Sequence, residues 1–142
     1  MTVYVSRVTD PRTCFDIRHA VFVEEQKIAV ELEQDELDAT AIHLLAREDG
    51  RPMGAARIVV SDGTGKIGRV CVLRDVRGTG LGVALINHAL DILREMPDVT
   101  RAALGAQVDA QGFYERLGFV PYGDVFDDAG IDHRMMELRF DS

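Results

Sequence analysis

Apolar and polar residues alternate along several short stretches of the chain, a pattern that predicts β-strands. Residues 2–8 (TVYVSRV) alternate in this way and are rich in β-branched side chains. Two longer apolar runs, AIHLLARED and PMGAARIVVSDG, are separated by Asp49-Gly50, a pair that is typical of hairpin turns. A second turn at 61–65 leads into residues 66–73. The pattern therefore predicts three successive antiparallel strands after the first one.

Helical spacing of apolar residues occurs in two other stretches. Asp10 is suited to be an N-cap and Pro11 to be a first helical residue, so the spacing that follows predicts a helix over about 10–26. A longer apolar stripe predicts a second helix over about 80–95. Between these helices, residues 31–38 (ELEQDELD) are acidic and predict a loop with one helical turn.

The last third of the chain returns to strands. Residues 99–107 predict a strand, and DAQGFYERLGF predicts a short helix that ends near Gly118. The remaining residues supply one or two closing strands, the last of them in HRMMELRF. Strands, a crossover helix and further strands indicate one domain over residues 1–142, in the α/β or α+β class and built on a mixed sheet.

Composition narrows the class of protein. A chain of 142 residues with 46% hydrophobic and 28% charged residues is typical of a single soluble domain. Charges interrupt every apolar segment before the roughly 20 residues that a membrane span needs. The first residues, MTVYVSRVTDP, lack the pattern of a signal peptide. We therefore expect a cytoplasmic protein that does not bind membranes.

Charge and cysteine usage exclude further classes. The net charge of −8 disfavours nucleic-acid binding and is compatible with attraction of a cationic small molecule, or with solubility alone. Cys14 and Cys71 are isolated among apolar neighbours, which predicts buried free thiols. Neither they nor His19 and His88 have the spacing of metal ligands, so we expect no metal site.

The stretch Arg77-Gly78-Thr79-Gly80-Leu81-Gly82 carries the strongest functional pattern. Glycines between a strand and a helix either permit a tight turn or let an anion approach the free N–H groups at the helix N-terminus. Arg77 could add a charge-assisted bond to phosphate. The stretch lacks the Gly-Lys-Ser/Thr of a Walker P-loop and does not fit the dinucleotide-binding glycine pattern.

Arg77-x-x-Gly80-x-Gly82 after a strand resembles motif A of the GCN5-related N-acetyltransferases (GNAT), in which the loop binds the pyrophosphate of acetyl-CoA. AQVDAQGFYERLGF resembles motif B, with Gln107 where an Asn is usual and with Tyr114 in register. Together with IRHAVFVEEQ, ELDATAIHLLA, IGRVCV and GIDHRMME, the similarity extends over about 15–138 and is to the ElaA-like branch.

The resemblance implies a fold and an activity. It implies a mixed, mostly antiparallel sheet of six to seven strands flanked by about four helices. It also implies transfer of an acetyl group from acetyl-CoA to a primary amine, by direct attack on the thioester. A β-bulge in the fourth strand would polarise the thioester carbonyl. The implied CoA-contacting residues are Val70, Cys71 and Val72 at this bulge, Arg77, Gly78, Thr79, Gly80, Leu81 and Gly82 in the loop, and Gln107.

Proton transfer needs an acid and a base. By resemblance, Tyr114 is the general acid that protonates the departing thiolate. The incoming amine is mostly protonated at neutral pH and needs a base. Candidates are Glu24, Glu25, Glu33, Asp35, His43 and His133. Among these, Glu33 could accept the proton or attract the amine. His43 could act similarly, but it also fits a core position in an alternating strand.

Other functions remain open from the sequence. A non-catalytic module that binds or senses acyl-CoA would share the glycine loop, and a pure interaction protein would leave that loop empty. Among the enzymes of the resembled family, the acceptor amine is a metabolite, a peptide or an antibiotic, and a homodimer is compatible with the resemblance. Release of free thiol with a panel of amines distinguishes the enzyme from the binding module.

Overall fold

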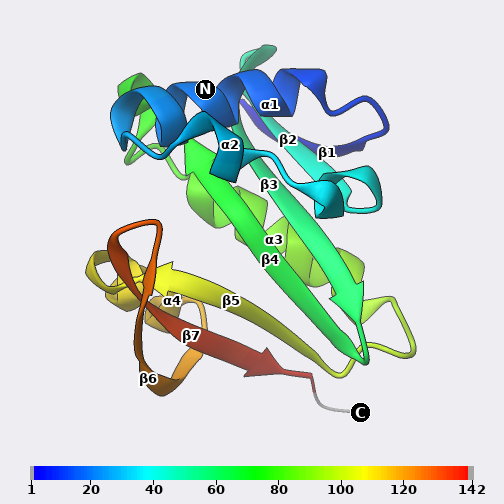
Figure 1. Ribbon diagram of the computed structural model, residues 1–142. Helices are drawn as coiled ribbons and strands as arrows, with labels where there is room; N and C mark the ends of the chain where they lie inside the picture. The colour runs from blue at the N-terminus through cyan, green and yellow to red at the C-terminus, as the bar shows by residue number, and fades with distance from the viewer. Residues whose placement is uncertain (1, 141–142) are drawn as a thin grey trace.

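The computed structural model describes residues 2–140 and consists of one seven-stranded mixed sheet with helices on both faces (Figure 1). The predicted α/β fold with six to seven strands is confirmed. The strands are β1 (Val3–Val8), β2 (Ile42–Glu48), β3 (Arg51–Ser61), β4 (Thr64–Val72), β5 (Arg101–Gln107), β6 (Val120–Asp128) and β7 (Ile131–Arg139). The longer helices are α1 (Arg12–Arg18), η1 (His19–Glu25), α3 (Leu81–Arg94) and α4 (Gln111–Arg116). Short turns are α2 (Val30–Glu33), η2 (Glu36–Ala39), η3 (Arg74–Val76) and η4 (Val108–Ala110).

The strands lie in the order β1-β2-β3-β4-β5-β7-β6. Strands β1 to β4 pair antiparallel, as the hairpin at Asp49-Gly50 and the turn after Ser61 predict. Helix α3 then connects β4 to β5, which makes that pair the one parallel junction in the sheet, because a crossover returns the chain in the same direction.

The parallel junction is short. Strands β4 and β5 pair only through Thr64, Gly65 and Lys66 of β4, opposite residues 101–103 of β5. Beyond Lys66 the two strands separate, and Figure 1 shows them adjacent at one end and spread apart at the other. The sheet therefore opens between its two halves on the side where β4 and β5 end.

Two apolar cores hold the layers together. On one face, α3 packs Leu85 and Leu93 against Ile58 and Ile67 of β3 and β4. A Cβ at Gly65 would lie 2.3 Å from Leu93, so the missing side chain brings α3 against the sheet. On the other face, α1 covers β2 to β4 with a smaller cluster that includes the two cysteines, Cys14 and Cys71. Both are free and buried, as predicted.

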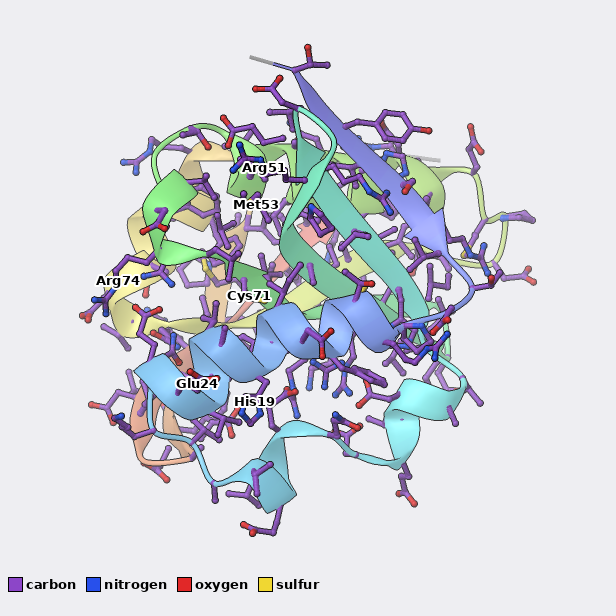
Figure 2. All side chains as sticks on the ribbon, turned by 90° about the horizontal axis from the view of Figure 1, so that it is seen from above. His19, Glu24, Arg51, Met53, Cys71 and Arg74 are labelled. Carbon is purple, nitrogen blue, oxygen red and sulfur yellow. The ribbon has the colours of Figure 1, made fainter. Side chains whose placement is uncertain are left out.

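The first helix differs from the simple helix predicted over 10–26. Its α-helical part begins at Arg12, whose N–H donates to the Asp10 carboxylate, and it continues as a π-helix from His19 to Glu25. The two parts form one continuous rod across the sheet, with Cys71 behind it (Figure 2). Hydrophobic spacing alone does not distinguish α from π winding, because both leave an apolar stripe on one side.

Residues 2–140 contain neither a membrane-spanning helix nor a cluster of metal-ligating side chains. No helix in this range has the length and apolar character that crossing a membrane requires. No group of three or more His, Cys, Asp or Glu side chains in the same range could hold a metal ion.

Candidate active site

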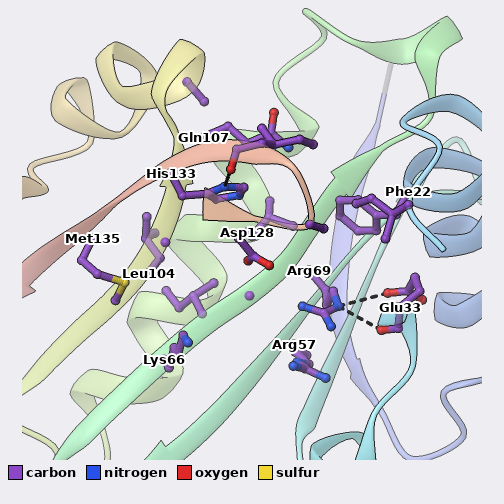
Figure 3. A pocket seen from close by; sticks show the side chains of 18 of the residues that line it. Phe22, Glu33, Arg57, Lys66, Arg69, Leu104, Gln107, Asp128, His133 and Met135 are labelled. Atoms are coloured by element: carbon purple, nitrogen blue, oxygen red, sulfur yellow. Dashed lines mark hydrogen bonds and ion pairs between the residues drawn. The ribbon is translucent and has the colours of Figure 1, made fainter. Parts of the chain in front are cut away.

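A cleft of about 580 Å³ occupies the opening between β4 and β5 (Figure 3). One wall comes from β3 and β4, the opposite wall comes from β5, β6, β7 and α4, and the segment after α1 covers one end. The lining residues divide into an apolar group and a polar group. The polar side chains are Gln26, Glu33, Arg57, Lys66, Arg69, Gln107, Tyr114, Asp128 and His133.

The glycine loop meets the N-terminus of α3. Gly78 and Gly80 have φ values of +84° and +92°, a region that favours glycine, and Gly80 is the N-cap of α3. A Cβ added at either position would meet no heavy atom within 4 Å, so both face open space. The N–H groups that begin α3 have no intrahelical partners, and the helix dipole adds positive potential there. The loop thus has the shape and the polarity of an anion site.

Not every loop side chain is free to reach an anion. The Arg77 guanidinium forms a bidentate pair with Glu25 at 2.6 Å for each contact, and its Nε donates to the carbonyl of Val72 at 3.0 Å. Arg74 lies 3.3 Å from the same carboxylate. Arg77 and Arg74 lower the pKa of Glu25 to about 2. In this structure the Arg77 side chain therefore ties the end of the π-helix to the end of β4, and its contact with phosphate stays a prediction.

A β-bulge interrupts β4 beside the cleft. Ala55 pairs with Cys71 and Arg57 pairs with Gly68, so Arg69 and Val70 together face Ala56. Arg69 has a φ of +51°, an uncommon value for a residue with a side chain. The expected bulge around 70–72 is present but lies one residue earlier in the chain. Bulges of this kind leave a backbone N–H unpaired and change its direction.

The bulge is clamped by a buried ion network. Arg69 Nε donates to the carboxylate and to the carbonyl of Glu33, at 3.0 and 3.1 Å. Arg18, 1% exposed, donates to both carboxylate oxygens of Glu33 and to Asp38. Arg57 donates to Asp38 and Asp35. Three arginines and three carboxylates thus tie α1 and the α2–η2 segment to β3 and β4.

The network changes the interpretation of Glu33. Its carboxylate lines the cleft, as predicted, but both oxygens accept hydrogen bonds from Arg18 and one also accepts from Arg69. Guanidinium groups thus occupy a hydrogen-bond position on each oxygen of this carboxylate. The geometry instead makes Glu33 the residue that positions the bulge.

His43 is also placed differently from a catalytic residue. It is 5% exposed on β2, with Nε2 2.9 Å from the carbonyl of Asp38, and its ring packs edge-on against Phe15. It does not belong to the cleft lining. His43 therefore lies in the core of the protein, which is the alternative that the sequence left open.

Tyr114 and Gln107 both line the cleft, on α4 and at the end of β5. Burial raises the pKa of the Tyr114 phenol to about 12, because a phenolate would lose hydration there. Gln107 donates from Nε2 to Oε1 of Gln26 at 3.1 Å, across to the segment that follows the π-helix. Gln107, which stands where motif B usually has an Asn, thus forms a hydrogen bond with another side chain of the protein in this structure.

His133 belongs to the cleft as well, and its proton can be placed. Nδ1 lies 2.7 Å from the carbonyl of Ile131 (Figure 3). Because a carbonyl oxygen only accepts, the neutral ring carries its hydrogen on Nδ1 and leaves a lone pair on Nε2. The ring stacks on Phe126 and its residue pairs with Gln107 across β5 and β7. Of the six base candidates, His133 combines a cleft position with an assigned lone pair.

Several site residues were not indicated by the sequence. Phe22 and Gln26 reach the cleft from the π-helix and the residue after it, and Arg57, Lys66 and Arg69 reach it from β3 and β4. None of these residues belongs to a sequence motif that would have identified it. Alternation with the apolar Ile67 was the signal available for Lys66, whereas the same alternation places Arg69 on the opposite face and only the bulge turns it toward the cleft.

Comparisons with known proteins agree on one family. The family described as "Acetyltransferase (GNAT) domain" matches residues 13–140. A Bacillus subtilis (strain 168) protein that bears an acetyltransferase name is 38% identical over 136 residues, with 94% of this chain and 92% of the relative covered. A Pseudomonas aeruginosa acyl-CoA N-acyltransferase structure has a TM-score of 0.83 at 31% identity and covers 96% of this chain and 97% of its own. Escherichia coli ElaA has a TM-score of 0.82 at 29% identity, with 96% and 99% covered.

Proposed function

Because the chain belongs to the GNAT acetyltransferase family, in its ElaA-like branch, we propose that it transfers the acetyl group of acetyl-CoA to the primary amine of a small molecule. The observation that carries the proposal is the position of the open glycine loop, which follows the end of β4 that separates from β5. A diphosphate bound at the loop would leave the arm of CoA free to enter the cleft between the strands.

Backbone N–H groups of residues 78–82 bind the diphosphate in this proposal. Four features support it: the left-handed glycines, the free space at their Cβ positions, the N-terminus of α3 and the nearby Arg74. Leu81 contributes only its backbone, because its side chain is buried in the core. Gln107 exchanges its bond with Gln26 for one with the CoA arm.

The bulge in β4 polarises the thioester. A backbone N–H at Arg69–Val70, freed from the β3 ladder, would donate to the carbonyl oxygen as negative charge develops on it. One oriented donor of this kind lowers a barrier by about 3 kcal/mol. The side chains of Glu33 and Arg69 hold the bulge in place and do not themselves contact the reacting atoms.

The proton steps use two residues on the opposite wall. Nε2 of His133 takes one proton from the ammonium of the acceptor, and the resulting amine attacks the thioester carbon. The tetrahedral intermediate then breaks its C–S bond. Tyr114 gives its phenolic proton to the departing thiolate, and the raised pKa keeps this phenol protonated at neutral pH until the thiolate forms. One of the two protons on the product nitrogen then leaves to solvent, which gives the neutral amide. The proton held by His133 also passes to solvent, and the Tyr114 phenolate takes one back, so both residues return to their starting states.

The test combines thiol release with acetyl-CoA binding. Wild-type protein should bind acetyl-CoA and release free thiol with at least one member of a panel of primary amines. Gly80→Ala should lose acetyl-CoA affinity, because the methyl group enters the open space beside the N-terminus of α3. Gly50→Ala is the matched control: Gly50 has a φ of +84°, also faces open space, and lies in the β2–β3 hairpin away from the cleft.

Each result has a distinct meaning. Equal loss of affinity in both variants would indicate that backbone strain, and not the cradle, causes the effect. Binding without thiol release from any amine would support a non-catalytic acyl-CoA-binding module. No binding at all would refute the proposed function.

A further inference from the structure

We propose that the acceptor amine carries a carboxylate, and that this carboxylate binds above Gly68 between the side chains of Arg57, Lys66 and Arg69. This inference rests on the proposed function, since it names the class of substrate for the same cleft. Three observations support it. The cleft wall is open where Gly68 lacks a side chain, cationic side chains around this opening have N–H groups without partners, and the opening lies a short distance from the bulge.

The gap is the missing side chain of Gly68. Gly68 pairs with Arg57 across β3 and β4, and Lys66 pairs with Val59, so these side chains project from the same face of the sheet. This face is the one covered by the α2–η2 segment, because Arg57 contacts Asp35 and Asp38 there. A Cβ at Gly68 would approach only Arg57 Nε, at 4.0 Å. The wall is therefore open at Gly68 and bordered by a guanidinium group.

Two arginines present unused donors to this opening. Arg57 is 7% exposed, and its hydrogen bonds to Asp35 and Asp38 use Nη1 and Nη2. Its Nε has no hydrogen-bond partner among residues 2–140. Arg69 uses Nε and Nη2, which leaves Nη1 without a partner in the same range. Within residues 2–140 only His43 Nδ1 is both fully buried and without a partner, so both arginine N–H groups remain accessible and can donate to a ligand oxygen in the opening.

Lys66 adds the uncompensated charge. The three arginines of the ion network are balanced by its three carboxylates, whereas Lys66 forms no ion pair with any described residue. An ammonium group beside two guanidinium groups gives this corner a positive potential, although the chain as a whole has a net charge of −8. Figure 3 shows Arg57, Lys66 and Arg69 on the β3–β4 side of the cleft.

The opposite wall suits the other end of the same molecule. Asp128, at the end of β6, lines the cleft and forms no ion pair within residues 2–140, and His133 lies on the neighbouring strand. An ammonium group would be attracted to this wall before it loses its proton to His133. Opposite charges on facing walls select a molecule that carries both an amine and a carboxylate.

The spacing indicates how far apart these groups are. Gly68 and Val70 are two residues apart along β4, which is at most roughly 7 Å, because Arg69 between them has a positive φ and is not extended. The amine must reach the thioester at the bulge while the carboxylate stays above Gly68. An α-amino acid holds its two groups too close together for this, whereas an ω-amino acid with three methylene groups between them matches the distance.

The test compares three amines of one length: 4-aminobutyrate, butylamine and 1,4-diaminobutane, which end in a carboxylate, a methyl group and an ammonium group. Wild-type kcat/KM should be highest for 4-aminobutyrate, by about tenfold or more over butylamine, the value of one charge-assisted hydrogen bond. Lys66→Gln should reduce this ratio about tenfold through KM. Lys27→Gln removes the same charge outside the cleft and should keep the wild-type ratio.

Gly68→Ala tests the gap itself. The added methyl group meets no atom closer than 4.0 Å, so the fold should survive while the opening is filled. The ratio of 4-aminobutyrate to butylamine should fall. A wild-type preference for butylamine, or equal effects of Lys66→Gln on all three amines, would overturn the proposal. A rise in the KM of acetyl-CoA in Lys66→Gln would also overturn it, because the bound anion would then be part of CoA.

Calorimetry separates this inference from the proposed function. 4-Acetamidobutyrate should bind the CoA-loaded protein more tightly than N-butylacetamide does, and Lys66→Gln should abolish the difference. If no amine releases thiol, the proposed function fails, and this comparison still decides whether the carboxylate site exists. If amines do release thiol but the two compounds bind with equal affinity, the proposed function stands and the carboxylate site is refuted.

Discussion

Replacement of Glu33 by Gln distinguishes a structural role of this residue from a catalytic one. The side chain is 4% exposed and neutralises two guanidinium groups, Arg18 at 2.9 Å and Arg69 at 3.0 Å. Glutamine has nearly the same shape but no charge, so the variant leaves the almost fully buried Arg18 with one carboxylate partner instead of two. Removal of one member of a buried ion pair costs about 3–5 kcal/mol, because the remaining charge stays desolvated.

This free energy converts into a large shift in melting temperature. At about 2.1 cal/mol/K per residue, a chain of 142 residues has an unfolding entropy of about 0.3 kcal/mol/K. A loss of 3–5 kcal/mol therefore lowers the midpoint by about 10–17 °C. Thermal and urea unfolding followed by circular dichroism measure the change, and a variant too unstable to fold meets the same expectation.

A matched control for Glu33→Gln removes a carboxylate from an ion pair at the surface. Asp10→Asn removes a carboxylate from an exposed ion pair with Arg12 and should leave the midpoint unchanged. Thiol release by Glu33→Gln, measured well below its midpoint, should persist at a reduced rate, since the bulge is held less firmly. A midpoint within about 3 °C of wild type combined with abolished turnover would refute the reasoning and make Glu33 the base.

Three further outcomes follow from the site. Tyr114→Phe should lower kcat about 10²- to 10⁴-fold with acetyl-CoA affinity unchanged in calorimetry, and unchanged kcat would remove the acid role. His133→Gln should lower kcat at neutral pH and recover part of it as pH rises and the amine loses its proton unaided; a pH–rate profile parallel to wild type would contradict the base role. Arginine contacts lower the pKa of Asp35 and Asp38, so both carboxylates contribute stability that is present above their ordinary pKa and is lost as pH falls below about 4. Urea midpoints measured from pH 6 to pH 2 should therefore fall mainly below pH 4, and a flat series would contradict the network.

The sequence alone determined the order of strands and helices and the position of the glycine loop. Alternation and helical spacing depend on one face of each element being buried, and this is a property of neighbouring residues. Gly78 and Gly80 were identifiable for the same local reason, because a left-handed turn before α3 needs glycine. The resemblance to the GNAT family and its ElaA-like branch was confirmed by the comparisons.

Only the tertiary structure decided which polar side chains share the cleft. Glu33 and His43 were both base candidates in the sequence, but the fold places Glu33 in a buried ion network and His43 in the core on β2, outside the cleft. Arg77 has the motif position of a phosphate ligand, yet Glu25, 52 residues away, holds its guanidinium. These outcomes depend on contacts between residues that are far apart in the sequence. The electrostatic energies of such contacts are set by burial and distance, and neither produces a periodic pattern in the sequence.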